Sequence, residues 1–162
     1  MKTGLIIPIF SAPISSVPIF SAVLLVSALP CLAALGDTVA SVAADQTHFQ
    51  ARMKSTQAQN YSVHEMTRDD GMVINEFVSS DGKVFGVSWK GPVIPDLSQF
   101  LGASFATFQG QVRAAGKQAR RRGAIIRSGD LVVESGGHMR DYRGRAYLSN
   151  LLPSNVSEAV IQ

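Results

Sequence analysis

The sequence predicts an α+β domain in which an antiparallel β-meander and a hairpin pack against one long amphipathic helix, with a shorter helix near the N-terminus. Two observations predict it. Short runs of β-branched and aromatic residues are separated by Asp-Gly turns, a pattern typical of antiparallel hairpins. Apolar residues then recur at three- and four-residue spacing, as in a helix that buries one stripe. At 162 residues the chain has room for one such domain.

The first 33 residues have the pattern of a secretory signal peptide, and residues 34–162 form the expected single α+β domain. Lys2 is the only charged residue before Asp37, and an apolar stretch lies between them. We expect cleavage before Ala34, after the small-residue exit Cys31-Leu32-Ala33. The mature protein would then be periplasmic or extracellular.

Two other uses of this leader fit the sequence less well. A transmembrane anchor needs about 20 apolar residues, whereas four prolines leave only residues 19–29 as a proline-free core. A lipid anchor on Cys31 would place Pro30 where lipoprotein signals have Gly, Ala or Ser. We therefore expect no transmembrane span in the mature chain. Because Cys31 is the single cysteine, cleavage would also exclude thiol and cysteine-metal chemistry.

The expected N-terminal helix runs from about Ser41 to Lys54. Val42, Phe49 and Met53 share one face of it, and Ser41 is suited to its N-cap position. The polar residues 55–60 are expected to form a loop.

The meander is expected at residues 61–66, 72–78 and 83–89, with Asp-Gly turns between the strands. In the third strand Phe85, Val87 and Trp89 occupy alternate positions. Since alternate side chains of a strand share a face, these three should point into the core together.

The long helix begins after Asp96, its expected N-cap, with Gln99 completing a capping box. Its C-terminal end is basic, and positive charges there interact favourably with the helix dipole. Its apolar stripe consists of Leu97, Phe100, Leu101, Phe105, Phe108 and Val112.

The last part of the chain is expected to form a hairpin. Residues 131–135 form one strand, Gly136-Gly137 a turn or bulge, and residues 138–148 a returning strand broken at Gly144. A short terminal helix is allowed near Glu158.

Charge is unevenly distributed along the chain. Residues 34–112 contain eight acidic and five basic residues, and residues 113–162 contain nine basic and four acidic ones. We expect a positive face that contacts an anionic envelope surface or an acidic polymer rather than nucleic acid, although a solvated surface explains the excess equally well. The residues proposed for this face are Lys117, Arg120, Arg121, Arg122, Arg140, Arg143 and Arg145.

The sequence contains no strong catalytic motif. The three histidines are far apart, so we expect no metal, since a zinc site needs three or four converging ligands, and we expect no other cofactor. Ser135, His138 and Glu134 are the residue types of a serine hydrolase. They lack the Gly-x-Ser-x-Gly turn, so Ser135 and His138 are weak candidates that would have to face each other across the Gly-Gly turn.

Three ordered blocks carry a resemblance to a known family. They are Ala34-Leu35-Gly36-Asp37-Thr38-Val39-Ala40-Ser41-Val42, then Phe85-x-Val87-x-Trp89-x-Gly91-Pro92 with Pro95-Asp96-Leu97, and then the segment 130–140 with Gly144-Arg145-Ala146-Tyr147 and Leu151-Leu152-Pro153. With them the chain resembles the bacterial exported proteins grouped as "domain of unknown function 2844". Asp37 stands where that family suggests a second Gly. The resemblance implies export and a single domain, and it implies no activity.

The sequence therefore favours an exported, non-enzymatic protein of the cell envelope, either a binding module or a structural accessory. The alternative is a small hydrolase that uses Ser135 and His138.

Overall fold

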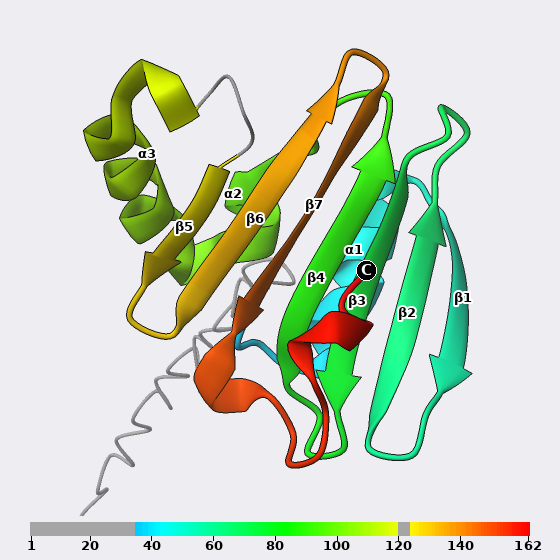
Figure 1. Cartoon of the computed structure of the whole chain (residues 1–162). Coiled ribbons are helices and arrows are strands. Elements are labelled where there is room, and N and C mark those ends of the chain that lie inside the picture. Colours follow the sequence, from blue (N-terminus) through cyan, green and yellow to red (C-terminus); the bar gives the residue numbers. More distant parts are fainter. Residues whose placement is uncertain (1–34, 120–123) are drawn as a thin grey trace, which may run out of the picture.

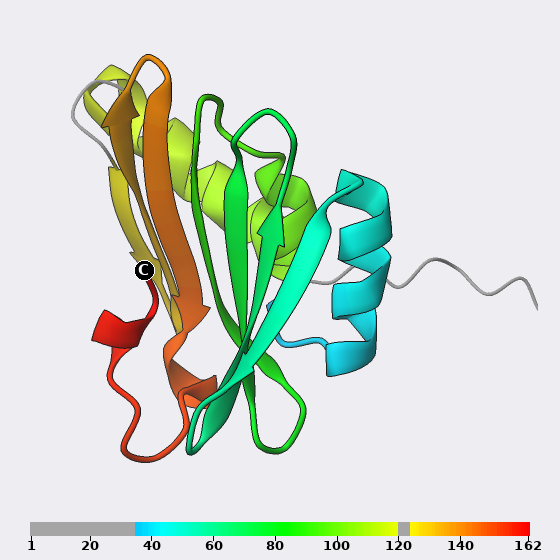
Figure 2. The ribbon, with the colours of Figure 1, turned by 90° about the vertical axis from the view of Figure 1, so that its right-hand side faces the viewer.

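The computed structural model of the chain describes residues 35–119 and 124–162. Its centre is a single antiparallel sheet in the order β1-β2-β3-β4-β7-β6-β5. Helices cover one face of this sheet (Figures 1 and 2). The fold is therefore α+β, as the sequence predicts. The strands are β1 (Arg52–Gln57), β2 (Tyr61–Thr67), β3 (Val73–Ser79), β4 (Val84–Gly91), β5 (Ala124–Ser128), β6 (Leu131–His138) and β7 (Asp141–Leu148).

The N-terminal helix is shorter than expected. Helix α1 spans Val39–Phe49, and Gln50 ends it in the left-handed conformation with φ 50°. Thr38, not Ser41, is the N-cap residue, and the buried Ser41 hydroxyl donates to the Thr38 carbonyl at 2.5 Å. The predicted continuation to Lys54 and the predicted loop at 55–60 are both wrong, because β1 begins at Arg52 and pairs with β2. Nearly every position of β1 is exposed, so this edge strand has no apolar alternation to reveal it.

The three predicted meander strands are confirmed as β2, β3 and β4, but one face assignment is wrong. Val78 pairs with Val84 and Phe77 pairs with Gly86, which leaves Phe85 as an extra residue in β4. Such a bulge reverses the alternation of side chains. Val87 and Trp89 consequently belong to the core under the helices, while Phe85 lies in a second cluster on the opposite face.

The predicted long helix is divided in two. Helix α2 (Leu97–Leu101) ends at Gly102, whose φ of 45° and ψ of −123° are not helical, and a 3-10 turn at Gly102–Ser104 precedes helix α3 (Phe105–Ala119). Asp96 is the N-cap as predicted and accepts a hydrogen bond from the Ser98 N–H at 2.9 Å. Gln99 does not complete a capping box, because its buried side chain donates to Asp45 instead.

Burial of the apolar stripe follows this division. Phe100 and Leu101 of α2 are fully buried, and the Phe100 ring stacks on Phe49 with centroids 5.0 Å apart. Phe105 and Phe108 of α3 are only partly buried against the same core. The short helix therefore supplies the inner part of the helix-side core.

The C-terminal hairpin also differs from the prediction. Strand β6 continues through Gly136 and Gly137, and the turn consists of Met139 and Arg140 because His138 pairs with Asp141. Strand β7 is unbroken at Gly144. A Cβ atom there would lie 2.3 Å from Cζ2 of Trp89, so this glycine lets the buried indole pack against the β7 backbone. Strand β5, which pairs with β6, was not predicted.

The face of the sheet away from the helices is partly covered by the C-terminal segment, residues 149–162 (Figures 1 and 2). It contains two 3-10 turns, Ser149–Leu151 and Glu158–Val160. Ile161 is fully buried and packs on Gly86, where a Cβ atom would lie 2.8 Å from its Cδ1. We call the uncovered remainder of this side the open face.

Candidate functional site

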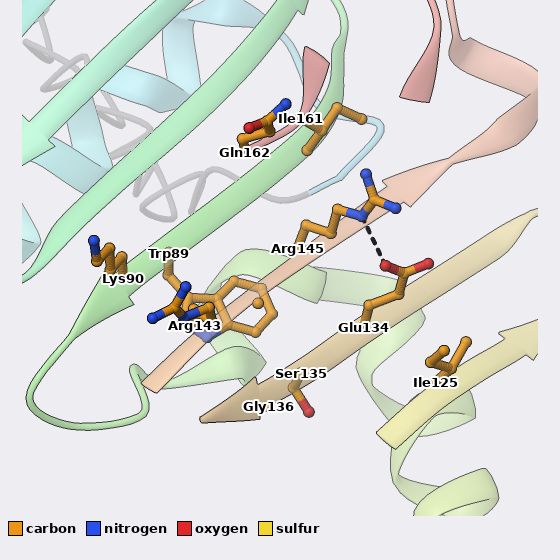
Figure 3. Close-up of a pocket in the computed structure, with 11 residues that line it drawn as sticks. Trp89, Lys90, Ile125, Glu134, Ser135, Gly136, Arg143, Arg145, Ile161 and Gln162 are labelled. Carbon is orange, nitrogen blue, oxygen red and sulfur yellow. Dashed lines mark hydrogen bonds and ion pairs between the residues drawn. The ribbon is translucent and has the colours of Figure 1, made fainter. Parts of the chain in front are cut away.

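The open face contains a hollow of about 660 Å³ beside the end of the C-terminal segment (Figure 3). Strands β4, β5, β6 and β7 and the C-terminal segment each contribute to it. Its lining residues are Trp89, Lys90, Ile125, Glu134, Ser135, Gly136, Arg143, Gly144, Arg145, Ile161 and Gln162.

The strand register places two cations directly opposite each other on this face. Lys90 of β4 pairs with Arg143 of β7, and Arg143 pairs in turn with Gly136 of β6. Like charges at directly opposite positions are destabilising. Gly136 has no side chain, so only backbone lies beside the two cations on the β6 side. Lys90, Arg143 and Gly136 form a cross-strand row. We call it the charged row, and it is the most positively charged part of the hollow.

Only one of the two cations forms an ion pair with a described carboxylate. Arg143 donates to Asp141 at 2.5 Å, and this bond keeps the pKa of the Asp141 carboxyl below its ordinary value. Within residues 35–119 and 124–162, no carboxylate lies within ion-pair distance of the Lys90 ammonium. The row therefore retains a positive charge that can receive an anion.

Arg145 has a different role from Arg143. Its Nε donates to Glu134 at 2.9 Å and its Nη1 to the Glu158 carbonyl at 2.8 Å. The guanidinium also lies 5.8 Å from the centroid of the Tyr147 ring. The bond to Glu134 raises the pKa of Arg145 above its ordinary value. Arg145 thus joins β6 to the C-terminal segment and holds one wall of the hollow in place.

Apolar side chains lie beside these charges. Ile125 is 68% exposed at the β5 side, and Ile161 borders the hollow from the C-terminal segment. The site therefore offers cations, one paired carboxylate and apolar contact to the same ligand. Four site residues were not predicted because they converge only through the pairing of distant strands and the return of the C-terminal segment: Lys90, Ile125, Gly136 and Ile161.

The structure does not bring the hydrolase candidates together. Ser135 and His138 lie three positions apart on β6, whose pairing with β7 has no register shift between them, so their side chains project from opposite faces. Glu134 is engaged by Arg145 at 2.9 Å and Arg127 at 3.8 Å. His138 is highly exposed, and its Nε2 lies 3.8 Å from Asp141. The prediction that Ser135 and His138 flank a two-residue turn is wrong.

The predicted positive face is only partly described. Arg143 and Arg145 project from the open face, and Arg140 lies at the exposed tip of the β6–β7 turn. Arg120, Arg121 and Arg122 lie outside the described residues, as does the side chain of Lys117. A single face containing all seven stays a prediction.

A buried acidic pair lies on the helix side of the sheet. Asp45 of α1 and Glu76 of β3 are both almost fully buried, and Gln99 of α2 donates to Asp45 Oδ1 at 2.6 Å. Burial, followed by the neighbouring Asp45 carboxyl, raises the pKa of Glu76 to about 9. Glu76 is consequently protonated near neutral pH, and the three groups connect both helices to the sheet.

Within the described part of the chain, no three side chains of the metal-binding types converge. In the same residues, no helix combines the length and apolar character needed to cross a bilayer.

Comparison with known proteins identifies the family of the chain. The model of the family described as Protein of unknown function (DUF2844) matches residues 31–161, nearly the whole chain. No curated protein and no solved structure matches it.

Proposed function

We propose that this chain, which belongs to the family Protein of unknown function (DUF2844), is an exported, non-enzymatic binding module of the cell envelope. Its ligand is an acidic polysaccharide, which it binds in the hollow of the open face. The observation that carries the proposal is the directly opposed pair Lys90 and Arg143 beside the bare backbone of Gly136.

Export is supported by the leader. Lys2, the apolar stretch and the exit Cys31-Leu32-Ala33 are the three parts of a secretory signal peptide. A cell envelope contains anionic polymers that a protein exported in this way would meet.

Recognition of an anion is supported by the energetics of the charged row. Two opposed cations repel each other across neighbouring strands, and an anion lying between them would relieve that repulsion. The Arg143 guanidinium can donate further hydrogen bonds to a carboxylate, since it presents five N–H groups and Asp141 accepts from Nη2 alone. Exposed Ile125 supplies apolar contact for the carbon face of a sugar ring.

A binding role also agrees with the arrangement of the reactive side chains. A hydrolase needs a nucleophile and a base within hydrogen-bond reach, and Ser135 and His138 project from opposite faces. This arrangement favours a binding role over the hydrolase alternative.

Titration calorimetry with polygalacturonate, a polymer of carboxylated sugars, tests the proposal. We expect binding at low ionic strength that weakens as salt is added, because exposed charges are screened over about 8 Å at physiological ionic strength. Arg143→Gln should weaken binding about tenfold or more, since it removes charge-assisted hydrogen bonds. Gly136→Val should weaken it by filling the hollow, and Gly136 is not among the glycines with positive φ, so valine fits its backbone.

The matched control is Lys54→Gln. Lys54 is an exposed cation on edge strand β1, so this change alters the net charge as Arg143→Gln does but at a distance from the hollow. Equal weakening by both variants, or no effect of Gly136→Val, would show that binding is diffuse and that the hollow is not the site.

A further inference from the structure

Two loop tips lie together at one end of the sheet. Strand β4 ends at Gly91, which pairs with Tyr142 at the start of β7. The loop at residues 92–95 and the turn Met139-Arg140 therefore leave the sheet next to each other, as Figures 1 and 2 both show. We call this region the hairpin end.

The turn at the hairpin end differs in composition from three of the other four hairpin connections among the described strands. The β2–β3, β3–β4 and β5–β6 connections contain Asp and Gly, the residues that tight turns favour. Here the two turn residues are Met139 and Arg140, and Arg140 has a φ of 68°. A non-glycine residue in the left-handed region is strained, and places where a sequence departs from such local rules are often functional.

The side chains at this end are unusually apolar for exposed loops. Met139 is 82% exposed, Ile94 is 56% exposed and Val93 is 50% exposed. In the described part of the chain only two other large apolar side chains, Val39 and Ile125, are comparably exposed. Three of these five exposed apolar side chains therefore lie on the two neighbouring loop tips of the hairpin end.

Cations surround these apolar tips. Arg140 lies in the turn itself, and Lys90 and Arg143 pair directly below it. The acidic residues near them are Asp141, which is bonded to Arg143, and the exposed Asp96, which follows the loop at residues 92–95. The adjacent β2–β3 turn is close to neutral, because Arg68 pairs with Asp70 and Arg52 with Asp69. The hairpin end therefore combines protruding apolar side chains with a net positive charge.

We propose that the hairpin end docks on the surface of a membrane containing anionic lipids. Met139, Val93 and Ile94 enter the interfacial region, and Arg140, Lys90 and Arg143 contact the lipid phosphates. An anionic bilayer surface offers both partners at once, an apolar layer beneath a negatively charged one. Separate protruding tips suit a soft interface of this kind better than they suit a flat protein surface. The proposal extends beyond the polysaccharide site but shares Lys90 and Arg143 with it, so the two ligands should compete, whereas Met139, Val93 and Ile94 belong to lipid docking alone.

Sedimentation with vesicles tests the apolar tips without changing charge. Full-length protein carrying both Met139→Ser and Ile94→Ser is compared with unaltered protein on vesicles of phosphatidylglycerol and phosphatidylethanolamine. We expect the partition coefficient to fall about tenfold or more, because two exposed apolar side chains lose their contact with the interface. Val39→Ser is the matched control, since Val39 is 46% exposed and its N–H bonds to Gly82 in the turn at the opposite end of β4.

A fluorescent probe reports on the tip directly, whatever residues 1–34 contribute to vesicle binding. An environment-sensitive dye is attached to Met139→Cys in a Cys31→Ala background, and the matched label is placed at Ser80→Cys in the exposed β3–β4 turn. We expect a blue shift on anionic vesicles for the label at position 139 and none for the label at position 80.

Three results would contradict docking through the hairpin end, and a fourth measurement separates this proposal from the polysaccharide site. Equal loss of partition for Val39→Ser and the double variant would overturn docking through the hairpin end. So would the absence of a shift at position 139, or equal binding to phosphatidylcholine vesicles. The double variant should keep its affinity for polygalacturonate. Failure of lipid docking would therefore leave the polysaccharide proposal standing, and the Arg143→Gln and Gly136→Val results decide that proposal independently.

Discussion

Glu76 illustrates how a single buried group makes stability depend on pH. Its carboxyl lies beside Asp45 under the helices, and its pKa is raised from 4.5 to about 9. Between these two values the folded state holds a proton that the unfolded state has lost. The free energy of unfolding therefore decreases as pH rises through this interval, by as much as about 1.4 kcal/mol per pH unit.

We predict that Glu76→Gln largely removes this decrease, because an amide does not ionise and fills nearly the same space. The other titratable neighbour is His64, opposite Glu76 on β2. Burial lowers its pKa from 6.5, so its contribution to stability rises with pH below that value. Urea titrations between pH 6.5 and about 9 therefore isolate Glu76. Glu65→Gln, on an exposed position of the same sheet, should keep the original slope.

The prediction for Glu76 fails if the Gln variant shows the same pH slope as the unaltered protein. The sequence alone could not have drawn attention to this residue. Glu76 occupies an ordinary position in a predicted strand, and its burial depends on α1 and α2 meeting over β3.

At the scale of elements, turns and helix caps that depend on neighbouring residues could be predicted from the sequence. Features that depend on contacts between distant parts of the chain could not. The Asp-Gly turns and the N-cap Asp96 act within a few residues, and the structure contains them as predicted. The bulge places Phe85 in one cluster with Ile161 and Tyr147, which lie far from it along the chain. The candidate site was not predictable for the same reason, because Lys90 and Arg143 become neighbours only when β4 pairs with β7.

Because the predicted long helix is divided, Phe100 and not Phe105 is expected to contribute most to the free energy of unfolding. The stripe pattern predicts that Phe105 is fully buried, but Phe100 is 1% exposed whereas Phe105 is only partly buried. We predict that Phe100→Ala lowers the free energy of unfolding by about 3 to 5 kcal/mol. Phe105→Ala should cost only about 1 to 2 kcal/mol, because less apolar surface returns to water.

Urea denaturation of the two alanine variants measures this difference, with Ala106→Gly in exposed α3 as a reference for helix propensity alone. A loss for Phe105→Ala as large as that for Phe100→Ala would contradict the partial burial of Phe105.

At the scale of the whole molecule, the two sides of the sheet are closed by different means. Three helices bury one side, whereas a segment of irregular chain covers part of the other, where Arg145 joins it to Glu134. The helix side carries the continuous core. The open face can therefore present charged residues without loss of that core, which is what a binding surface requires.

The hydrogen bonds of the first described residues affect when the predicted cleavage before Ala34 can occur. Leu35 is buried, and its N–H donates to the Phe100 carbonyl at 2.9 Å, while the Gly36 N–H donates to Val84 at 2.9 Å. The predicted cleavage before Ala34 would thus leave a single residue ahead of Leu35, which is bonded to the fold. A peptidase needs an extended chain on both sides of the bond that it cleaves, so we predict that cleavage at this position would have to precede folding.

We predict that protein recovered from the envelope or medium of the producing cell begins at Ala34, as measured by intact mass. Full-length protein that has already folded should resist signal peptidase in vitro, because Leu35 is held by its hydrogen bond to Phe100. The same protein held in urea and diluted into peptidase should be cut before it folds. Leu35→Ala is an informative variant, since it loosens the start of the domain and should make the folded chain easier to cleave. Rapid cleavage of the unaltered folded chain would show that residues after the cleavage site detach readily, and recovery of uncleaved chain from the membrane fraction would contradict the signal peptide itself.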